Sequence, residues 1–228
     1  MNIPIYTSTN ENIYALKEAL APQKGDYVFS VAASLDVPLM LLEQKAAVVG
    51  VDIDKDQIEY CHLRKNYLLA KKIPSPIHVP KSFGFLKNKN VSWRNKFMQE
   101  MNVDVVLQHL DLLELICGDI LNLDLETALS QINGIPLGFS IDYSSFNKVY
   151  LSNVFDHYFC DSNVVQANMI KDTDTFFKKF KSGTRFSLTE RFIGFDFSQS
   201  TQVTEDICLS KKLSTQDGYW NHHVLYKK

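Results

Sequence analysis

The chain has 228 residues, of which 45% are hydrophobic and 12% aromatic, so it can fill a sizeable core and falls outside the disordered and fibrous classes. Its 24 basic and 26 acidic residues give a formal net charge of −2, which argues against a strongly basic nucleic-acid binder. No apolar run approaches the roughly 18 residues that span a bilayer, and the first six residues have neither the basic start nor the apolar stretch of a signal peptide. The length allows one or two domains, and we expect the simpler case, a single domain over residues 1–228 with an insertion. We expect no transmembrane segment.

The cysteines are far apart in the sequence, so no CxxC pair or zinc-ribbon spacing is present. They are Cys61, Cys117, Cys160 and Cys208. So few cysteines in a chain of this length are not typical of a disulfide framework and indicate a reducing compartment. We expect a cytoplasmic protein.

The first part of the chain alternates between helix and strand patterns. Helical spacing of apolar residues or favourable first-turn residues predict helices over 11–22, 37–45 and 55–71. Short apolar runs typical of strands buried on both faces lie between them, at 27–32 and 46–53. This alternation predicts a parallel sheet with helices on its faces, which binds ligands beyond the carboxyl ends of the strands.

Residues 72–112 interrupt the alternation. Three prolines lie close together at its start, a basic stretch follows, and a helical pattern runs from about 92 to 112. We interpret the segment as an insertion, which either caps the site or forms a solvated excursion.

The alternation then resumes. Strand patterns occupy 113–118, 148–153 and 184–190, and helical patterns occupy 123–133 and 164–181. Two final strand patterns, at 203–209 and 219–226, are joined by a short polar connection and predict an antiparallel hairpin at one edge of the sheet. The expected fold class is a doubly wound α/β sheet, mostly parallel.

The turn after the first strand contains small residues but no glycine. It reads Ala32-Ala33-Ser34-Leu35-Asp36, where a dinucleotide-binding fold would carry a G-x-G-x-x-G motif. A pyrophosphate needs close approach of the backbone, and Asp36 would repel it. The turn therefore disfavours NAD and FAD and favours a cationic or zwitterionic nucleoside.

Acidic residues follow the next strands. Asp52 ends the second strand, where a carboxylate can accept hydrogen bonds from both ribose hydroxyls, although Asp52 and Asp54 can also be explained as helix caps. Asp119 follows the third strand and can accept a hydrogen bond from an adenine amino group, while Ile120 can pack on the ring. The acids after successive strands are a stronger signal together than any one is alone.

This pattern resembles the class I S-adenosylmethionine-dependent methyltransferase fold. The resemblance rests on Asp52, the pair Gly118-Asp119, the strand 148–153 and the final strand with its segment 222–226. It implies a Rossmann-like sheet of seven strands and S-adenosylmethionine as cofactor.

A narrower resemblance points to one family. The residues Asn10-Glu11-Asn12 and the segments 25–34, 51–57 and 151–157 are similar to the BtaA-type family, which transfers the 3-amino-3-carboxypropyl group of S-adenosylmethionine to diacylglycerol. Together the two resemblances imply a set of cofactor-binding residues. They are Ala32, Ala33, Ser34, Asp52, Ile53, Gln57, Asp119, Ile120, Ser152 and Asn153.

Three candidate catalytic residues follow the fourth strand, where the acceptor should meet the sulfonium. His157 has an ordinary pKa near 6.5 and suits a general base, and Asp156 can orient it or act as the base itself. Tyr158 or Phe155 can pack beside the sulfonium by a cation–π contact. The alternative is that Phe155 and Tyr158 belong to the core and that His157 is a surface residue.

No metal site is expected. His109 and Asp111 lack further ligands nearby, and His222 and His223 are neighbours in a strand, so they point to opposite faces.

Two classes of function remain open. One is an S-adenosylmethionine-dependent transferase that moves a methyl or 3-amino-3-carboxypropyl group to a small-molecule or lipid-like acceptor. The other is a non-catalytic protein that kept the fold and binds a nucleoside or a partner. The near-neutral charge, and Leu151-Ser152-Asn153-Val154 in place of an Asn-Pro-Pro-Tyr-like turn, argue against a nucleic-acid acceptor.

Overall fold

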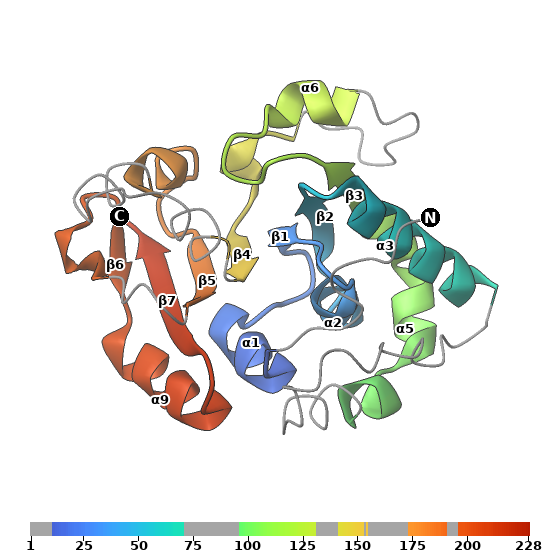
Figure 1. Ribbon diagram of the computed structural model, residues 1–228, viewed down its shortest axis with the longest axis horizontal. Helices are drawn as coiled ribbons and strands as arrows, with labels where there is room; N and C mark the ends of the chain where they lie inside the picture. The colour runs from blue at the N-terminus through green and yellow to red at the C-terminus, as the bar shows by residue number, and fades with distance from the viewer. Residues whose placement is uncertain (1–10, 71–95, 131–140, 153, 155–172, 191–195) are drawn as a thin grey trace.

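The computed structural model describes residues 11–70, 96–130, 141–152, 154, 173–190 and 196–228, and all structural statements concern these ranges. They form one seven-stranded sheet with the order β3-β2-β1-β4-β5-β7-β6 (Figure 1). The strands are β1 (Tyr27–Val31), β2 (Ala47–Asp52), β3 (Leu113–Cys117), β4 (Lys148–Ser152), β5 (Arg185–Glu190), β6 (Val203–Glu205) and β7 (Asn221–Lys227).

Helices lie between the strands along the chain. The α-helices are α1 (Ile13–Leu20), α2 (Asp36–Glu43), α3 (Lys55–Leu69), α5 (Val103–Gln108), α6 (Leu125–Ser130) and α9 (Ile207–Asp217). Short 3₁₀ turns are η1 (Leu110–Leu112), η2 (Tyr143–Ser145) and η3 (Phe197–Gln199). Side chains of Asn12 and Asp54 accept backbone N–H groups at the starts of α1 and α3, which explains why these helices begin there.

The strand directions confirm the predicted fold class. β3, β2, β1, β4 and β5 pair in parallel, and β7 pairs antiparallel with both β5 and β6. The order reverses between β1 and β4, so the sheet is doubly wound. This point of reversal is where sheets of this kind bind ligands.

Both faces of the sheet are covered by helices. Neighbouring residues of a strand point to opposite faces, so Val28 and Phe29 of β1 show what packs on each face. Val28 packs in the cluster that contains residues of α1, α2, α3 and α5. Phe29 packs on the other side, with α6 and a group of aromatic rings. Phe180 and Phe186 belong to that group, and their rings meet edge to face with centroids 5.2 Å apart.

The predicted C-terminal hairpin is wrong in its connection. β6 and β7 do pair antiparallel, but the strand predicted over 203–209 ends at Glu205 and α9 follows it. Asp206 begins this helix because its side chain accepts the N–H of Leu209, and Gly218 ends it with a φ of 72°. An eleven-residue helix therefore lies between two strands that were expected to be joined by a turn.

The helix predicted over 92–112 is also interrupted. Residues 96–100 are helical, and α5 and η1 follow as separate pieces. The break falls at Asn102, whose side chain accepts the N–H of Val105 while its own N–H donates to Glu43. Phe97 and Val106 are buried against the α2 side of the sheet, so this part of the insertion belongs to the core and is not a solvated excursion. Residues 72–95 lie outside the described ranges.

Within the described ranges, none of the helices has the length and apolar character that crossing a bilayer requires.

Candidate functional site

The candidate site lies at the carboxyl ends of β1, β2 and β3. These three strands are neighbours in the sheet and run in parallel, so their carboxyl ends meet at one edge. The ends of β1 and β2 and the loops that leave them contain half of the ten predicted cofactor-binding residues. They are Ala32, Ala33, Ser34, Asp52 and Ile53.

The turn after β1 adopts an unusual backbone conformation. Ala33 has a φ of 40° and Leu35 a φ of 74°, and both values lie in the left-handed region that glycine favours. Each such residue with a Cβ costs about 1–2 kcal/mol. The turn thus adopts glycine-favoured conformations at two positions without glycine, and the Leu35 N–H closes it on the Ala32 carbonyl at 2.8 Å.

Asp52 lies directly beside this turn. Its Oδ2 accepts the Ala33 N–H at 3.2 Å, and its Oδ1 accepts the Asp54 N–H at 3.0 Å. Burial raises the pKa of Asp52, although the backbone N–H donors oppose the increase. Each carboxylate oxygen can accept a further hydrogen bond, which is what two ribose hydroxyls require.

The structure separates the two explanations for the acids after β2. Asp54 caps α3, because its side chain accepts the Asp56 N–H at 2.9 Å. Asp52 instead fixes the two loops at the strand ends. The helix cap therefore does not account for Asp52, which leaves its predicted role at the ribose open.

Ile53 and Cys117 are apolar or weakly polar residues at the carboxyl ends of β2 and β3. Ile53 is 74% exposed, although it is a large aliphatic residue next to a half-buried acid. Cys117 ends β3 and is also exposed, and its thiol lies 3.8 Å from the Ile53 carbonyl. Ile53 thus offers an apolar surface beside Asp52.

The two residues predicted around an adenine differ in their positions. Asp119 is partly exposed, and its carboxylate accepts the Leu121 N–H at 3.0 Å and the Asn122 side-chain amide at 2.7 Å. Ile120 is only 6% exposed and packs in the core on the α6 side of the sheet. Asp119 stays at the edge of the sheet, whereas Ile120 presents little surface to a ligand.

Three side chains in or against the first turn are buried within the protein, and they are Ser34, Asp36 and Gln57. Asp36 is fully buried, accepts the Ser34 hydroxyl at 3.0 Å and forms an ion pair with the buried Arg64 at 2.9 Å. The expectation that Asp36 faces the ligand and repels phosphate is therefore wrong, because Arg64 pairs with it away from solvent. Gln57 is also fully buried, and it donates to the Ala33 carbonyl at 2.6 Å.

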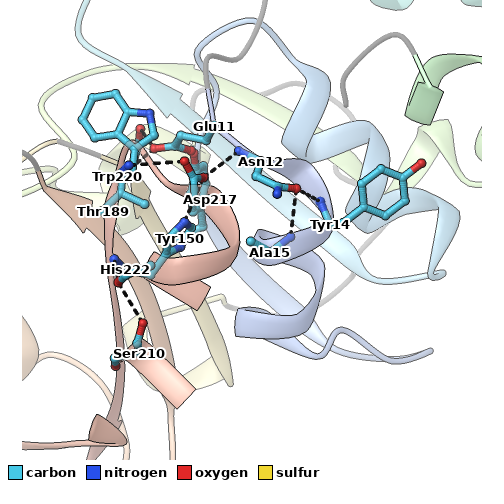
Figure 2. A network of polar contacts seen from close by, with 12 residues as sticks. Glu11, Asn12, Tyr14, Ala15, Tyr150, Thr189, Ser210, Asp217, Trp220 and His222 are labelled. Carbon is cyan, nitrogen blue, oxygen red and sulfur yellow. Dashed lines mark hydrogen bonds and ion pairs between the residues drawn. The ribbon is translucent and has the colours of Figure 1, made fainter. Parts of the chain in front are cut away.

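A buried polar cluster that the sequence did not predict lies around Glu11 (Figure 2). Glu11 is 1% exposed and accepts hydrogen bonds from the hydroxyls of Tyr150, Ser152 and Thr189. Burial raises the pKa of Glu11, against the effect of these donors. The cluster joins the start of α1 to β4 and β5. In the sequence, Glu11 stood out only as part of Asn10-Glu11-Asn12 in the narrower resemblance, which gave it no role.

Ser152 connects this cluster to the end of β4. It has a φ of 50°, and the register between β4 and β5 shifts between Tyr150 and Ser152. Strained residues of this kind concentrate at functional sites. Asn153 and the predicted catalytic residues Asp156, His157 and Tyr158 follow, and they lie outside the described residues.

Three of the described histidines have separate partners. His222 contacts Asp217, His223 contacts Glu205, and the ring of His109 contacts the Val105 carbonyl. The part of the chain that the structure describes contains no group of three side chains arranged to hold a metal ion.

Comparison with known proteins identifies the fold. No family model and no curated protein matches the chain. Among solved structures, the rRNA methyltransferase aviRa from Streptomyces viridochromogenes is 12% identical with a TM-score of 0.50, and the match covers 93% of this chain and 82% of that chain. An RNA methyltransferase from Salinibacter ruber in complex with S-adenosylhomocysteine is 14% identical with a TM-score of 0.44, over 99% of this chain and 92% of that chain.

At such identities a likeness shows the fold alone. The chain has the Rossmann-like fold of class I methyltransferases, with the antiparallel C-terminal strands at one side of the sheet. This agrees with the first resemblance that the sequence indicated.

Proposed function

We propose that the chain is an S-adenosylmethionine-dependent transferase. The observation that carries the proposal is the hydrogen bond between the Ala33 N–H and the Asp52 carboxylate, 3.2 Å long. It brings the turn after β1 and the acid after β2 together beside the point where the strand order reverses, which is the place and the chemistry that a nucleoside needs.

The residues around this contact fit a cationic nucleoside better than a phosphorylated one. The loops 32–36, 52–54 and 117–120 contain no basic residue. Of their acids, Asp52 and Asp119 are available beside the strand ends, whereas Asp36 pairs with Arg64 and Asp54 caps α3. In this proposal Asp52 accepts the ribose hydroxyls, Asp119 accepts the adenine amino group, and Ile53 packs against the base. Ser34 and Gln57 are buried, so in this proposal they do not contact the ligand through their side chains. Ser34 belongs to the turn, and Gln57 supports the turn through the Ala33 carbonyl.

S-adenosylmethionine supplies a sulfonium whose attached carbons are already activated. The protein then has to align a nucleophile within about 3–3.5 Å of one of these carbons and to accept its proton. The end of β4 lies next to β1 in the sheet, so the residues after β4 are the proposed acceptor side. His157 remains our candidate base, with Asp156 orienting it and Tyr158 beside the sulfonium.

The acceptor in this proposal is a small molecule or a lipid-like molecule. Methyl transfer is common among proteins of this fold, whereas the narrower resemblance favours transfer of the 3-amino-3-carboxypropyl group. The solved structure aviRa is described as an rRNA methyltransferase, so RNA belongs among the acceptors to be tested, although a net charge of −2 argues against it.

Binding is the first test. Isothermal titration calorimetry should detect S-adenosylmethionine and S-adenosylhomocysteine, and show much weaker binding of NAD and ATP. Asp52→Ala should weaken the two expected ligands by at least roughly tenfold, because hydrogen bonds to a charged group contribute about 1.5–3 kcal/mol. Asp111→Ala is the matched control. Asp111 is an exposed acid just before β3, so it lies near the amino end of that strand, whereas the candidate site lies at the carboxyl ends.

Turnover is the second test. Incubation with S-adenosylmethionine and separate small-molecule, lipid and RNA fractions should yield S-adenosylhomocysteine for methyl transfer, or methylthioadenosine for aminocarboxypropyl transfer. Binding without either product from any fraction would favour the non-catalytic alternative. Equal affinity of wild type and Asp52→Ala would show that the ribose assignment is wrong.

A further inference from the structure

Three side chains of α3 hold the turn after β1. Gln57 donates to the Ala33 carbonyl at 2.6 Å, and the thiol of Cys61 donates to the same carbonyl at 3.1 Å. The guanidinium of Arg64 donates to the Ser34 carbonyl. We propose that Gln57, Cys61 and Arg64 are positioning residues, which fix the glycine-free turn in the conformation that receives the cofactor.

The spacing of the three residues explains how one helix can do this. Positions 57, 61 and 64 follow one another at intervals of four and three, so they lie along one face of α3. All three are buried, and two of them are strongly polar, on a face where a helix usually carries aliphatic residues. Buried polar groups need hydrogen-bond partners, and here the turn supplies them.

Arg64 extends the contact to the next helix. Its guanidinium lies 2.9 Å from the carboxylate of Asp36, the first residue of α2, and both side chains are buried. Asp36 in turn accepts the Ser34 hydroxyl at 3.0 Å. The turn is therefore held at two carbonyls and at one side chain, and the start of α2 is fixed with it.

The turn needs this support because of its backbone conformation. Ala33 and Leu35 occupy the left-handed region, which glycine adopts readily and residues with a Cβ avoid. The Ala33 N–H also donates to Asp52, so a turn that relaxed would lose a contact that orients the predicted ribose ligand. The inference rests on the proposed function, since it assumes that this turn contacts S-adenosylmethionine.

A double-mutant cycle between Gln57→Leu and Ala33→Gly tests the proposal, with S-adenosylhomocysteine as the probe in calorimetry. Gln57→Leu should weaken binding roughly tenfold, because Ala33 then leaves the left-handed region more easily. In the Ala33→Gly background the same substitution should weaken binding only about two- to threefold, since glycine takes this conformation without support. Loss of the same size in both backgrounds, or no loss at all, would overturn the proposal.

Two further measurements separate positioning from general damage. Asn66→Leu makes the same amide-to-aliphatic change on the exposed side of α3, and it should leave binding and thermal stability unchanged. Cys61→Ala removes another donor to the Ala33 carbonyl. It replaces Gln57→Leu in the cycle if that variant folds poorly, and its effect on binding should likewise be smaller in the Ala33→Gly background.

Amide hydrogen exchange gives a result that does not depend on any ligand. The amides of residues 33–36 should exchange at least several times faster in Gln57→Leu than in the wild type, whereas those of β3 should not change. Equal exchange in the turn would show that the three positioning residues do not hold it. Faster exchange in Gln57→Leu, together with a wild-type chain that binds neither S-adenosylmethionine nor S-adenosylhomocysteine, would instead overturn the proposed function, and with it the role of these residues in cofactor binding.

Discussion

The imidazole Nε2 of His222 lies 3.0 Å from the Oδ2 of Asp217, and neither side chain is exposed. Asp217 also accepts the backbone N–H groups of Asn12, at 3.0 Å, and of Trp220, at 3.2 Å (Figure 2). One buried carboxylate therefore joins the end of α9 to the neighbouring β7 and to the start of α1, which is 205 positions away in the sequence.

Removal of this carboxylate should destabilise the fold. We expect Asp217→Asn to lower the free energy of unfolding by about 2–4 kcal/mol. In the wild type both carboxylate oxygens accept hydrogen bonds, whereas the amide NH₂ of asparagine would face one of these donors and leave it without an acceptor. Urea denaturation checks this, with Asp111→Asn as an exposed control that should change stability by less than about 0.5 kcal/mol. Equal unfolding midpoints would show that the pair contributes no net stability.

The same pair has a pH signature. Burial alone would raise the pKa of Asp217, but hydrogen bonds from His222 and the Asn12 N–H hold it below its usual value. A carboxyl group with a lowered pKa in the folded state stabilises the protein above its unfolded value, near 3.9, and this contribution is lost as the pH falls through the folded value. Unfolding measured between pH 3 and 5 should depend less on pH in Asp217→Asn than in the wild type.

His223 gives the opposite dependence. Burial alone would lower its pKa, but the carboxylates of Glu190 and Glu205, 3.6 and 2.8 Å away, raise it to about 9. Because this value lies above the unfolded one, near 6.5, the protonated form stabilises the fold fully below pH 6.5, and the stabilisation is lost as the pH rises through about 9.

The expected loss between pH 6.5 and 9 is roughly 2–3 kcal/mol in the free energy of unfolding. In His223→Gln this part of the pH dependence should disappear. Thermal denaturation across that range tests it, and a His223→Gln profile with the slope of the wild type would contradict the assignment.

Much of the fold could be predicted from the sequence, because β1 and β2 are short apolar runs that contain several valines, which is typical of strands buried on both faces. The position of Asp52 at a strand end followed directly. The C-terminal region failed for a local reason, since the segment after Val203 carries the β-branched and apolar residues of a strand as well as the Asp206 cap of a helix.

The inward side chains of the candidate site could not be predicted in this way. Asp36 comes soon after β1 and Asp52 ends β2, but Asp36 pairs with Arg64 at a distance of 28 positions in the sequence. Glu11 and Thr189 are 178 positions apart. Contacts of this range depend on how helices pack on the sheet, and a spacing pattern along the chain carries no information on that packing.

The connection between β6 and β7 allows a direct test of the corrected element. Asp206→Ala should lower the free energy of unfolding by about 0.5–2 kcal/mol, because it leaves the Leu209 N–H without the side-chain acceptor that begins α9. Gly218→Ala should cost about 1 kcal/mol through backbone strain alone, because φ is 72° there and no atom lies within 4 Å of the added Cβ. Chemical denaturation measures both, and two unchanged midpoints would contradict the observed helix.

A substitution at Ile53 separates ligand binding from stability. Ile53 is 74% exposed, so Ile53→Ser removes almost no buried apolar surface and should leave the unfolding midpoint unchanged. If Ile53 packs against the adenine, the same change should weaken S-adenosylhomocysteine about 3- to 10-fold in calorimetry, since it removes apolar contact area from the bound ligand. Ile207→Ser is the matched control, because Ile207 is 70% exposed and begins α9, away from the turn after β1. Equal affinities of the two variants would exclude Ile53 from the binding surface.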